Sequence, residues 1–593
     1  MATTYDKASL VMIPSGVKES KLYSIKPTSG DGDFTFSRGT DTATRVNSSG
    51  LIEKERGNEI LQSNQFDTNW SVSVASITGG QPDKDGGSTA WLLSKTGGAY
   101  GGIYQTNTLN AGVWNVSLYM KAGTNNFGSI RLSTGGSNDI RRKVDLTTGA
   151  ITAASASTAT PIAESATDVG GGWWRFSFSG NMATGSITIN LYAGDTADTT
   201  GNIYIQDAML NQGLVAQPYI ETTTAAVYEG ITDNLPRLDY HNPDSPTPNS
   251  CPSLLLEPSR TNSDTNSEYL ANKPIVTNVS VTTNSTTSPE GVVNASTITN
   301  NTTSGQHQLT DNTFSVTSGT DYTISLFIKY NDAQYVRLQF GGTPFGSTNW
   351  QNFDVLNGTK GSSGGGITSA DASIEDYGNG WYRCIVTADA TATGSNGAFQ
   401  IRILEDDNTS DVPSFAGTGL STYAWGAQLE AGSYPTSYIP TYGTSASRAA
   451  DYSVRSDMQD YVGADEGTWF MHFKDLFFDI TGTGQGSINL VHTSGNQIEF
   501  IQDGNLQYKI TLNNSTAIEN LDGEDKVAIA WSTSGLVIYI NGASRFTSSS
   551  SAYANPYSVF ELTRVDRRPR VDMKQILFFN TRLTNAELAA LTA

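Results

Sequence analysis

Gly172-Trp173-Trp174-Arg175 returns later in the chain as Gly380-Trp381-Tyr382-Arg383, a shift of 381 − 173 = 208 residues. The strand-like stretch Trp114–Lys121 returns at the same shift as Tyr322–Lys329, since 329 − 121 is also 208. A shift shared by separate motifs marks a duplicated unit, and a repeat of this kind sets the architecture of a chain. The sequence therefore predicts two copies of one domain.

A second shift shows that the two copies differ in length. Ala208–Leu210 and Tyr219-Ile220 correspond to Ala427–Leu429 and Tyr438-Ile439, and both pairs are 219 residues apart. A single insertion in the second copy accounts for the increase from 208 to 219 residues. Repetition of a whole module is more typical of a protein that binds or displays than of an enzyme built around one active site.

Apolar residues stand at every second position in both copies. Val116, Leu118 and Met120 show this in the first copy, and Leu338 and Phe340 in the second. A period of two over four to eight residues indicates half-buried strands. With 59 glycines and only 16% charged residues, the composition favours an all-β chain with many turns. We therefore predict β-sandwiches or jelly rolls.

The length of 593 residues is too great for one hydrophobic core. We predict an all-β protein with three tandem antiparallel β-sandwich or jelly-roll domains after an N-terminal anchoring segment. The predicted units are the anchoring segment at 1–57, the first repeat at 58–222, a Pro-rich linker at 223–262, the second repeat at 263–448, a linker at 449–466 and a third sandwich at 467–593.

Residues 1–57 lie outside the repeat. Phe34–Arg38 alternates like a short strand. A segment of this size cannot bury a core of its own, so we expect it to pack on another chain or a larger assembly. Its predicted role is an anchor.

Local signals mark the remaining parts of the chain. The prolines of Asn242–Asn249 predict a stiff, exposed connector between the repeats. In the third unit, Asn541-Gly542 predicts a hairpin, because both residues tolerate positive φ. Thr584–Glu587 has the pattern of a capping box, which predicts one short terminal helix.

The composition argues against several classes of partner. A net charge of −21 disfavours nucleic acid and anionic lipid surfaces and makes a neutral or amide-bearing ligand electrostatically easier. Cys251 and Cys384 are the only cysteines, so a disulfide framework is not expected. Met1–Lys7 lacks the pattern of a signal peptide, and no apolar stretch approaches membrane-spanning length. We expect synthesis in a cytoplasm, with no membrane insertion.

Catalytic motifs are scarce. The four histidines are scattered without metal-type spacing, and no nucleophile elbow or phosphate-binding loop stands out. The acidic run Glu405–Asp407 could in principle serve a glycosidase, but a solvated loop is the simpler interpretation in a chain with 57 acidic residues. We therefore predict that the protein is not an enzyme.

The repeated aromatic pairs are the candidate glycan-binding residues. Neighbouring residues of a strand point to opposite faces, so one member of each pair is predicted to be core and the other, Trp174 or Tyr382, to lie on the outer face. Aromatic faces stack on sugar rings, although the alternative is that both members are packed. Arg175 and Arg383 either contact the ligand or form a salt bridge with a neighbouring loop.

Two acidic clusters offer hard oxygen ligands for calcium. They contain Asp195 and Asp198 in the first repeat, and Asp406 and Asp407 in the second. No full ligand set accompanies either cluster. Calcium is therefore the only cofactor that we consider, and the sequence leaves it open whether any is bound.

Three groups of phrases resemble virion structural proteins of tailed bacteriophages. They are Phe34–Arg38 with Ala43–Asn47 and Gly50–Glu53, then Leu235–Tyr240 with Cys251–Asn262, and finally Tyr434–Thr441 with Ser447–Asp451. In such proteins the two copies would be carbohydrate-binding-module-like jelly rolls. The third unit is similar to laminin-G-like or concanavalin-type sandwiches, through Lys526–Trp531, Ile538–Gly542 and Phe578–Thr584.

The resemblance implies a phage virion surface protein, made in the bacterial host cytoplasm and displayed as a fibre, spike or capsid decoration. Its N-terminal segment would contact other virion proteins, and its lectin-like modules would bind host or environmental glycans. A homo-oligomer, with a trimer favoured, would raise the effective concentration of weak sites. The alternatives are a purely structural protein that cements capsid or tail without binding glycans and, as a third possibility, a polysaccharide depolymerase.

Overall fold

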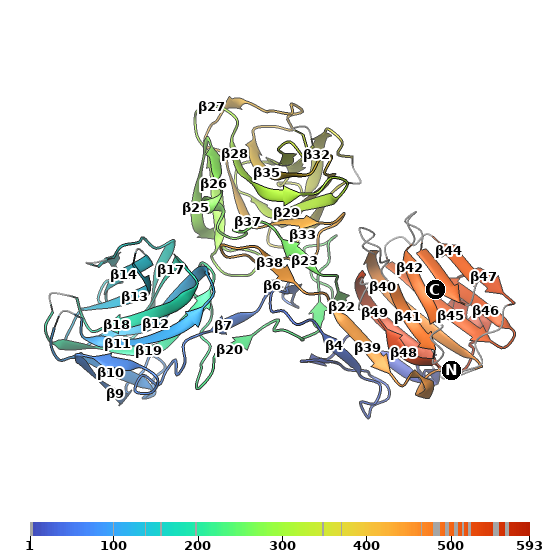
Figure 1. Ribbon diagram of the computed structural model, residues 1–593, viewed down its shortest axis with the longest axis horizontal. Helices are drawn as coiled ribbons and strands as arrows, with labels where there is room; N and C mark the ends of the chain where they lie inside the picture. The colour runs from blue at the N-terminus through green and yellow to red at the C-terminus, as the bar shows by residue number, and fades with distance from the viewer. Residues whose placement is uncertain are drawn as a thin grey trace.

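The computed structural model is almost entirely β, as predicted (Figure 1). It describes all residues except 1–3, 99, 137, 155–156, 196–197, 347–348, 369–370, 464, 478–486, 493–496, 503–507, 513–514, 520–523, 550–556 and 564–568. Three lobes are visible, and the two ends of the chain lie in the same lobe. No helix among the described residues is long and apolar enough to cross a bilayer.

The first repeat is a sandwich of two six-stranded antiparallel sheets. One sheet runs in the order β9 (Ala75–Gln81), β10 (Ala90–Lys95), β19 (Gly201–Gln212), β12 (Gly112–Ala122), β17 (Trp173–Met182) and β16 (Ala163–Gly170). The other runs in the order β8 (Ser71–Ser73), β11 (Gly102–Leu109), β18 (Gly185–Tyr192), β13 (Phe127–Gly135), β14 (Asn138–Asp145) and β15 (Ile151–Ala153). Between them lie the alternating apolar residues, including Val116, Leu118 and Met120.

The second repeat has the same strand order. Its first sheet contains β25 (Val279–Thr286), β26 (Ala295–Asn300), β37 (Ser421–Ala431), β29 (Asp321–Tyr330), β34 (Trp381–Asp389) and β33 (Ala372–Asp376). Its second contains β24 (Ile275–Thr277), β28 (Gln308–Val316), β35 (Gly394–Leu404), β30 (Tyr335–Gly341), β31 (Trp350–Asp354) and β32 (Thr359–Gly364). The identical topology agrees with a duplication.

A buried asparagine lies at the N-terminal start of each repeat, at equivalent positions. Asn58 donates to the carbonyls of Ala208 and Ile220, and Asn262 donates to those of Ala427 and Ile439. Each of these asparagines is the last residue of a strand in a short two-stranded ribbon. The first ribbon pairs β7 (Arg56–Asn58) with β20 (Val227–Glu229), and the second pairs β23 (Arg260–Asn262) with β38 (Ala446–Arg448).

The third sandwich is assembled from separate parts of the chain. Its first sheet joins β21 (Arg237–Asp239), β22 (Ser253–Leu256), β49 (Arg570–Phe579), β40 (Gly467–Phe477), β45 (Glu524–Ser532), β46 (Gly535–Ile540) and β47 (Ala543–Ser548), and β1 (Leu10–Met12) also pairs with β49. Its second sheet joins β2 (Val17–Lys18), β3 (Lys21–Leu22), β4 (Phe34–Ser37), β39 (Tyr452–Ser456), β48 (Tyr557–Glu561), β41 (Ser487–His492), β42 (Gln497–Gln502), β43 (Tyr508–Leu512) and β44 (Ser515–Glu519).

The expectation that residues 1–57 pack on another chain needs correction. Leu10 and Met12 pair with β49, while Phe34 and Phe36 enter the core of the third sandwich from β4. All four side chains are buried within this chain. Because the sandwich itself covers their apolar surface, this part of the segment needs no other chain to bury it.

The two predicted linkers also need correction. The linker at 223–262 contains β21 and β22, which pair with each other and with β49, so the Pro-rich stretch between them is a loop of the third sandwich. The linker at 449–466 contains β39, which lies between β4 and β48. The apolar run Leu254–Leu256 is the local signal for strand β22, but the neighbouring prolines led to the prediction of a linker.

The local signals in the third unit are confirmed. Asn541 and Gly542 have positive φ and close the β46–β47 hairpin. Thr584 and Glu587 form the capping box of helix α2 (Asn585–Thr592). The remaining short elements are α1 (Thr4–Lys7), β5 (Arg45–Val46), β6 (Ile52–Glu53), β27 (Ser304–Gly305), β36 (Phe415–Ala416) and the 3-10 turns Leu270–Asn272 and Met458–Asp460.

Candidate functional site

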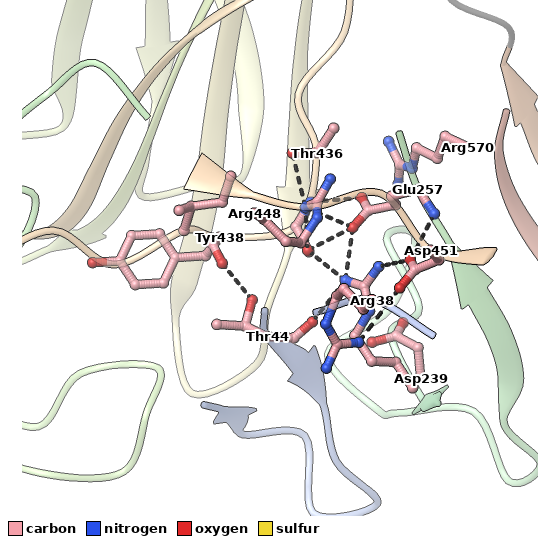
Figure 2. A network of polar contacts seen from close by, with 12 residues as sticks. Arg38, Thr44, Asp239, Glu257, Thr436, Tyr438, Arg448, Asp451 and Arg570 are labelled. Atoms are coloured by element: carbon pink, nitrogen blue, oxygen red, sulfur yellow. Dashed lines mark hydrogen bonds and ion pairs between the residues drawn. The ribbon is translucent and has the colours of Figure 1, made fainter. Parts of the chain in front are cut away.

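A buried network of charged side chains lies at the junction between the second repeat and the third sandwich (Figure 2). Arg237 on β21 donates to Glu257 over 2.7 Å and also pairs with Asp451. Arg448 on β38 approaches the same Glu257 oxygen at 2.9 Å. The four side chains are fully buried, so each charge depends on its partners rather than on water.

The network is also satisfied by hydrogen bonds from the backbone and from hydroxyl groups. Glu257 accepts from the backbone N–H and the hydroxyl of Ser437, each over 2.7 Å. Burial opposes ionisation of Glu257, but the positive charges of Arg448, Arg237 and Arg570 outweigh it and hold the pKa well below its usual range. The carboxylate is therefore charged at neutral pH.

The sequence phrases within 34–53, 235–262 and 434–451 supply this network. Arg38, Arg237, Glu257, Arg448 and Asp451 all belong to them, or lie at their ends. Figure 2 shows Arg38, Glu257, Arg448 and Asp451 converging from segments that are far apart in the sequence. The phrases thus mark the structural junction between the second repeat and the third sandwich.

A cavity of about 290 Å³ opens beside the network, at the seam between the second repeat and the third sandwich. The second repeat contributes Arg383 and Glu375, which face each other across β34 and β33. The third sandwich contributes Arg570 and Asp572 from β49. Burial raises the pKa of Asp572 despite the nearby Arg570, so protonation of this carboxyl is favoured there.

His241 lies on the wall of the same cavity. Its ring is 4.1 Å from that of Tyr377, between ring centroids. Burial, opposed by Asp239, lowers the pKa of His241 to about 4. The imidazole is therefore neutral at physiological pH, and its buried Nε2 has no hydrogen-bond partner among the described residues.

A second cavity of about 320 Å³ lies at the seam between the two repeats. Arg175 on β17 and Thr167 on β16 line it from the first repeat, and Asn284 and Val293 line it from the second. Since β17 and β16 correspond to β34 and β33, both cavities are built on the same face of a repeat. Asn115 also lines this cavity; it is 1% exposed, and no residue that the structure describes forms a hydrogen bond with its Oδ1.

The two predicted arginines have equivalent neighbours. Arg175 donates to Ser117 Oγ and to the carbonyl of Gln217, at 3.1 and 2.6 Å. Arg383 donates to Ser325 Oγ and to the carbonyl of Thr436, at 2.9 and 2.8 Å. Each arginine therefore holds the loop that follows its repeat through a hydrogen bond to a backbone carbonyl, where the sequence interpretation had a salt bridge, and it also lines a seam cavity.

The predicted aromatic residues line neither seam cavity. Trp173 and Trp381 are buried in the core, as expected of the first members. Trp174 and Tyr382 are half-buried, and each covers a turn glycine of the neighbouring sheet, Gly149 or Gly358. Their visible contacts are thus packing contacts at equivalent turns.

A third hollow, of about 530 Å³, lies near the first ribbon. Trp114, Tyr228 and Tyr442 contribute aromatic surface, and Glu55 and Glu59 contribute carboxyls. Burial, together with Asp41 and Asp233, raises the pKa of Glu55 to about 8. Sequence reasoning did not identify this hollow, because its residues come from six separate segments.

Of the four predicted calcium ligands, three contact other groups of the chain and one is exposed. Asp195 pairs with Lys143 at 2.9 Å, and Asp198 accepts from the backbone N–H of Asp195 at 2.7 Å. Asp407 accepts from Asn352 and Ser362, while Asp406 is exposed. Within the described residues, no group of three or more His, Cys, Asp and Glu side chains could hold a metal ion.

No protein-family model and no curated protein matches this chain. Among solved structures, the N-terminal CBM22-1-CBM22-2 tandem domain from Paenibacillus barcinonensis Xyn10C is similar to it. The identity is 11%, and the match covers 63% of this chain and 97% of that chain with a TM-score of 0.21. At that TM-score the similarity carries no argument about function.

Proposed function

We propose that this chain is a non-enzymatic surface protein of a tailed-phage particle, and that its repeats bind glycans at the seam cavities. The observation that carries the glycan part is the repetition of one arrangement. A cavity lies beside the equivalent arginine on the equivalent strand of both repeats. A fold that builds the same polar hollow twice is suited to a ligand that repeats, such as a polysaccharide.

The cavity chemistry suits hydroxyl-rich ligands. The cavity between the repeats is lined by Asn115, Asn284 and Arg175. Within the described residues, the side-chain oxygens of the two asparagines have no donor and Nε of Arg175 has no acceptor. A sugar hydroxyl can donate to the first two and accept from the third. A neutral sugar would also avoid repulsion by the net charge of −21.

The particle part of the proposal rests on the resemblance of the connector phrases to phage virion proteins. The buried strands of residues 1–57 belong to the third sandwich, so attachment would fall to exposed residues of this segment. Tyr5, Tyr23 and Ile25 are 44%, 36% and 45% exposed. They are the apolar side chains that another virion protein would cover, and a trimer of this chain would multiply weak glycan sites.

Binding of the full-length protein to extracted host polysaccharides, with and without calcium, tests the glycan part. Asn284→Gly removes an acceptor at the seam without backbone strain, since Asn284 has φ +51°. We expect about tenfold weaker binding, or about 1.4 kcal/mol. Asn379→Gly is the matched control, because Asn379 is an exposed turn residue with φ +53°.

The outcomes separate this proposal from its rivals. Saturable binding that Asn284→Gly weakens and Asn379→Gly leaves unchanged supports it. A folded protein that binds no polysaccharide favours a purely structural, cementing role. Release of reducing ends from the polysaccharide would instead establish a depolymerase. Particle incorporation that is unchanged in a Tyr23→Ser, Ile25→Ser variant would contradict the proposed attachment surface.

A further inference from the structure

The outer face of one sheet in the first repeat carries charged and aromatic side chains side by side. On β13, Arg131 faces Arg141 of β14 on one side and Asn190 of β18 on the other. Tyr104 of β11 lies opposite Asn190 in turn. Residues that lie directly opposite each other share a face of the sheet, so these four side chains lie on the same surface.

Arg141 is enclosed but not satisfied. Its guanidinium carbon lies 4.4 Å from the ring centroid of Tyr100 and 5.2 Å from that of Tyr192. The residue is only 7% exposed, and its Nε and Nη1 have no hydrogen-bond partner in the described part of the chain. Buried charged donors without acceptors are costly unless a ligand supplies the acceptor.

The neighbouring charges are already paired. Arg131 binds Asp139 at 2.6 Å, and Lys143 binds Asp195 at 2.9 Å. Among the residues that the structure describes, no carboxylate forms an ion pair with Arg141. This position therefore offers an unneutralised positive charge on an otherwise acidic protein.

The second repeat fills the equivalent face with its own chain. The connection from β35 to β37, residues 405–420, is longer than the one from β18 to β19, residues 193–200. Arg337 donates to the carbonyls of Ser410 and Asn408, both at 2.6 Å. Trp350, which faces Gln339 as Arg141 faces Arg131, donates to a carboxylate oxygen of Asp411 at 2.8 Å.

The insertion that enlarges the sequence shift thus has a structural consequence. It brings carbonyl and carboxylate oxygens onto the donors of Arg337 and Trp350. The first repeat has the shorter connection, and among the described residues Nε and Nη1 of Arg141 have no such partner. Because carbonyl and carboxylate oxygens cover this face of the second repeat, the equivalent face of the first repeat should bind a ligand that supplies oxygen acceptors.

We propose that the outer β11–β18–β13–β14 face of the first repeat binds a carboxylate-bearing sugar. The carboxylate pairs with Arg141, and the exposed rings of Tyr100 and Tyr104 pack against the sugar ring. The inference rests on the proposed glycan-binding function but places an acidic sugar at a site separate from the seam cavities. The equivalent face of the second repeat is closed by residues 405–413 and binds no sugar.

Calorimetric titration of the full-length protein with tri-galacturonate tests the inference, with the tri-methyl ester of the same sugar as the neutral probe. We expect the wild type to bind the acid at least tenfold more tightly than the ester. Arg141→Gln should remove this preference. Arg402→Gln alters the equivalent face of the second repeat and should leave binding unchanged, because residues 405–413 already cover that face.

Two further measurements, binding by the Tyr104→Ala variant and competition by inorganic phosphate, complete the experiment. Tyr104→Ala changes an exposed residue, so it decides the matter if Arg141→Gln fails to fold, and we expect it to weaken binding at least fivefold. Inorganic phosphate that competes as strongly as the sugar would overturn the sugar assignment. Equal binding of acid and ester would overturn the role of Arg141. Binding of a neutral host polysaccharide without binding of tri-galacturonate overturns this inference alone, whereas binding of neither glycan overturns the proposed function as well.

Discussion

Arg237 donates to Glu257 over 2.7 Å, and neither side chain is exposed to solvent. Arg448 and Asp451 complete the network from the far end of the second repeat. Because each charge is neutralised by partners inside the protein rather than by water, the pairing specifies how the segments at the junction enter the third sandwich. An ion pair buried in this way is costly to break.

Replacement of Glu257 by Gln should therefore destabilise the protein strongly. The variant keeps the side-chain volume but leaves Arg237 and Arg448 with one carboxylate fewer in a buried site. We expect a loss of about 3–5 kcal/mol in the free energy of unfolding. Urea unfolding followed by tryptophan fluorescence measures it.

The exposed pair Arg56 and Glu229 supplies the control. Its atoms are 2.8 Å apart, but the two side chains are 34% and 49% exposed. Glu229→Gln should change the free energy of unfolding by less than about 1 kcal/mol. Equal effects of the two substitutions would show that the buried network does not hold the junction together.

Acid should weaken the same junction. The pKa of Glu257 is held below its unfolded value of about 4.3, so its contribution to stability is fully present above that pH. This contribution is lost as the pH falls toward the folded pKa. The difference in unfolding free energy between wild type and Glu257→Gln should therefore shrink progressively below about pH 4. A difference that stays constant from pH 7 to pH 3 would contradict the assignment.

The duplication could be predicted because its signal is local. Gly172–Arg175 and Gly380–Arg383 repeat a short motif, and the alternating residues around Val116 and Leu338 have the period of strands. The strand order of the two copies then follows from one fold used twice. Arg175 and Arg383 were also identified as equivalent by this repeat alone.

The third sandwich could not be predicted in full, because its strands come from opposite ends of the chain. Nothing near Leu10–Met12 indicates that these residues pair with Arg570–Phe579. The same limit applies to the candidate sites. Whether the donors of Arg141 or the oxygen of Asn115 find partners depends on segments that only the tertiary structure brings near.

The contribution of the N-terminal strands to the core of the third sandwich can be tested directly. Phe34 meets Phe560 edge to face, with 6.1 Å between ring centroids. Phe34→Ala should lower the free energy of unfolding by about 3–5 kcal/mol. Deletion of residues 1–37 should leave a third sandwich that is cleaved rapidly by protease. Tyr23→Ala, at a residue 36% exposed, is the matched control, and its effect should be within about 0.5 kcal/mol. A deletion variant as protease-resistant as the wild type would refute the shared core.

The contact between Tyr382 and Gly358 can be tested by a double-mutant cycle. Gly358 has φ +66°, and a Cβ there would lie 2.5 Å from Tyr382 Cε1. Gly358→Ala should therefore destabilise by more than about 1 kcal/mol. The cost should fall when Tyr382 is also Ala, because only the backbone strain remains. Equal costs in both backgrounds would show that the ring does not press on the turn, leaving Tyr382 available to a ligand.

Calcium should have little effect on the second repeat. Asp407 already accepts from the backbone N–H and hydroxyl of Ser362, at 2.9 and 2.8 Å, and from Asn352 at 2.8 Å. Its removal in Asp407→Ala should cost about 1–3 kcal/mol, because the donors of Asn352 and Ser362 lose their acceptor. Asp406→Ala, at the adjacent exposed residue, should be neutral within about 0.5 kcal/mol. Thermal unfolding with and without millimolar calcium completes the test. A calcium-dependent rise in Tm that Asp407→Ala abolishes would show instead that this carboxylate binds the ion.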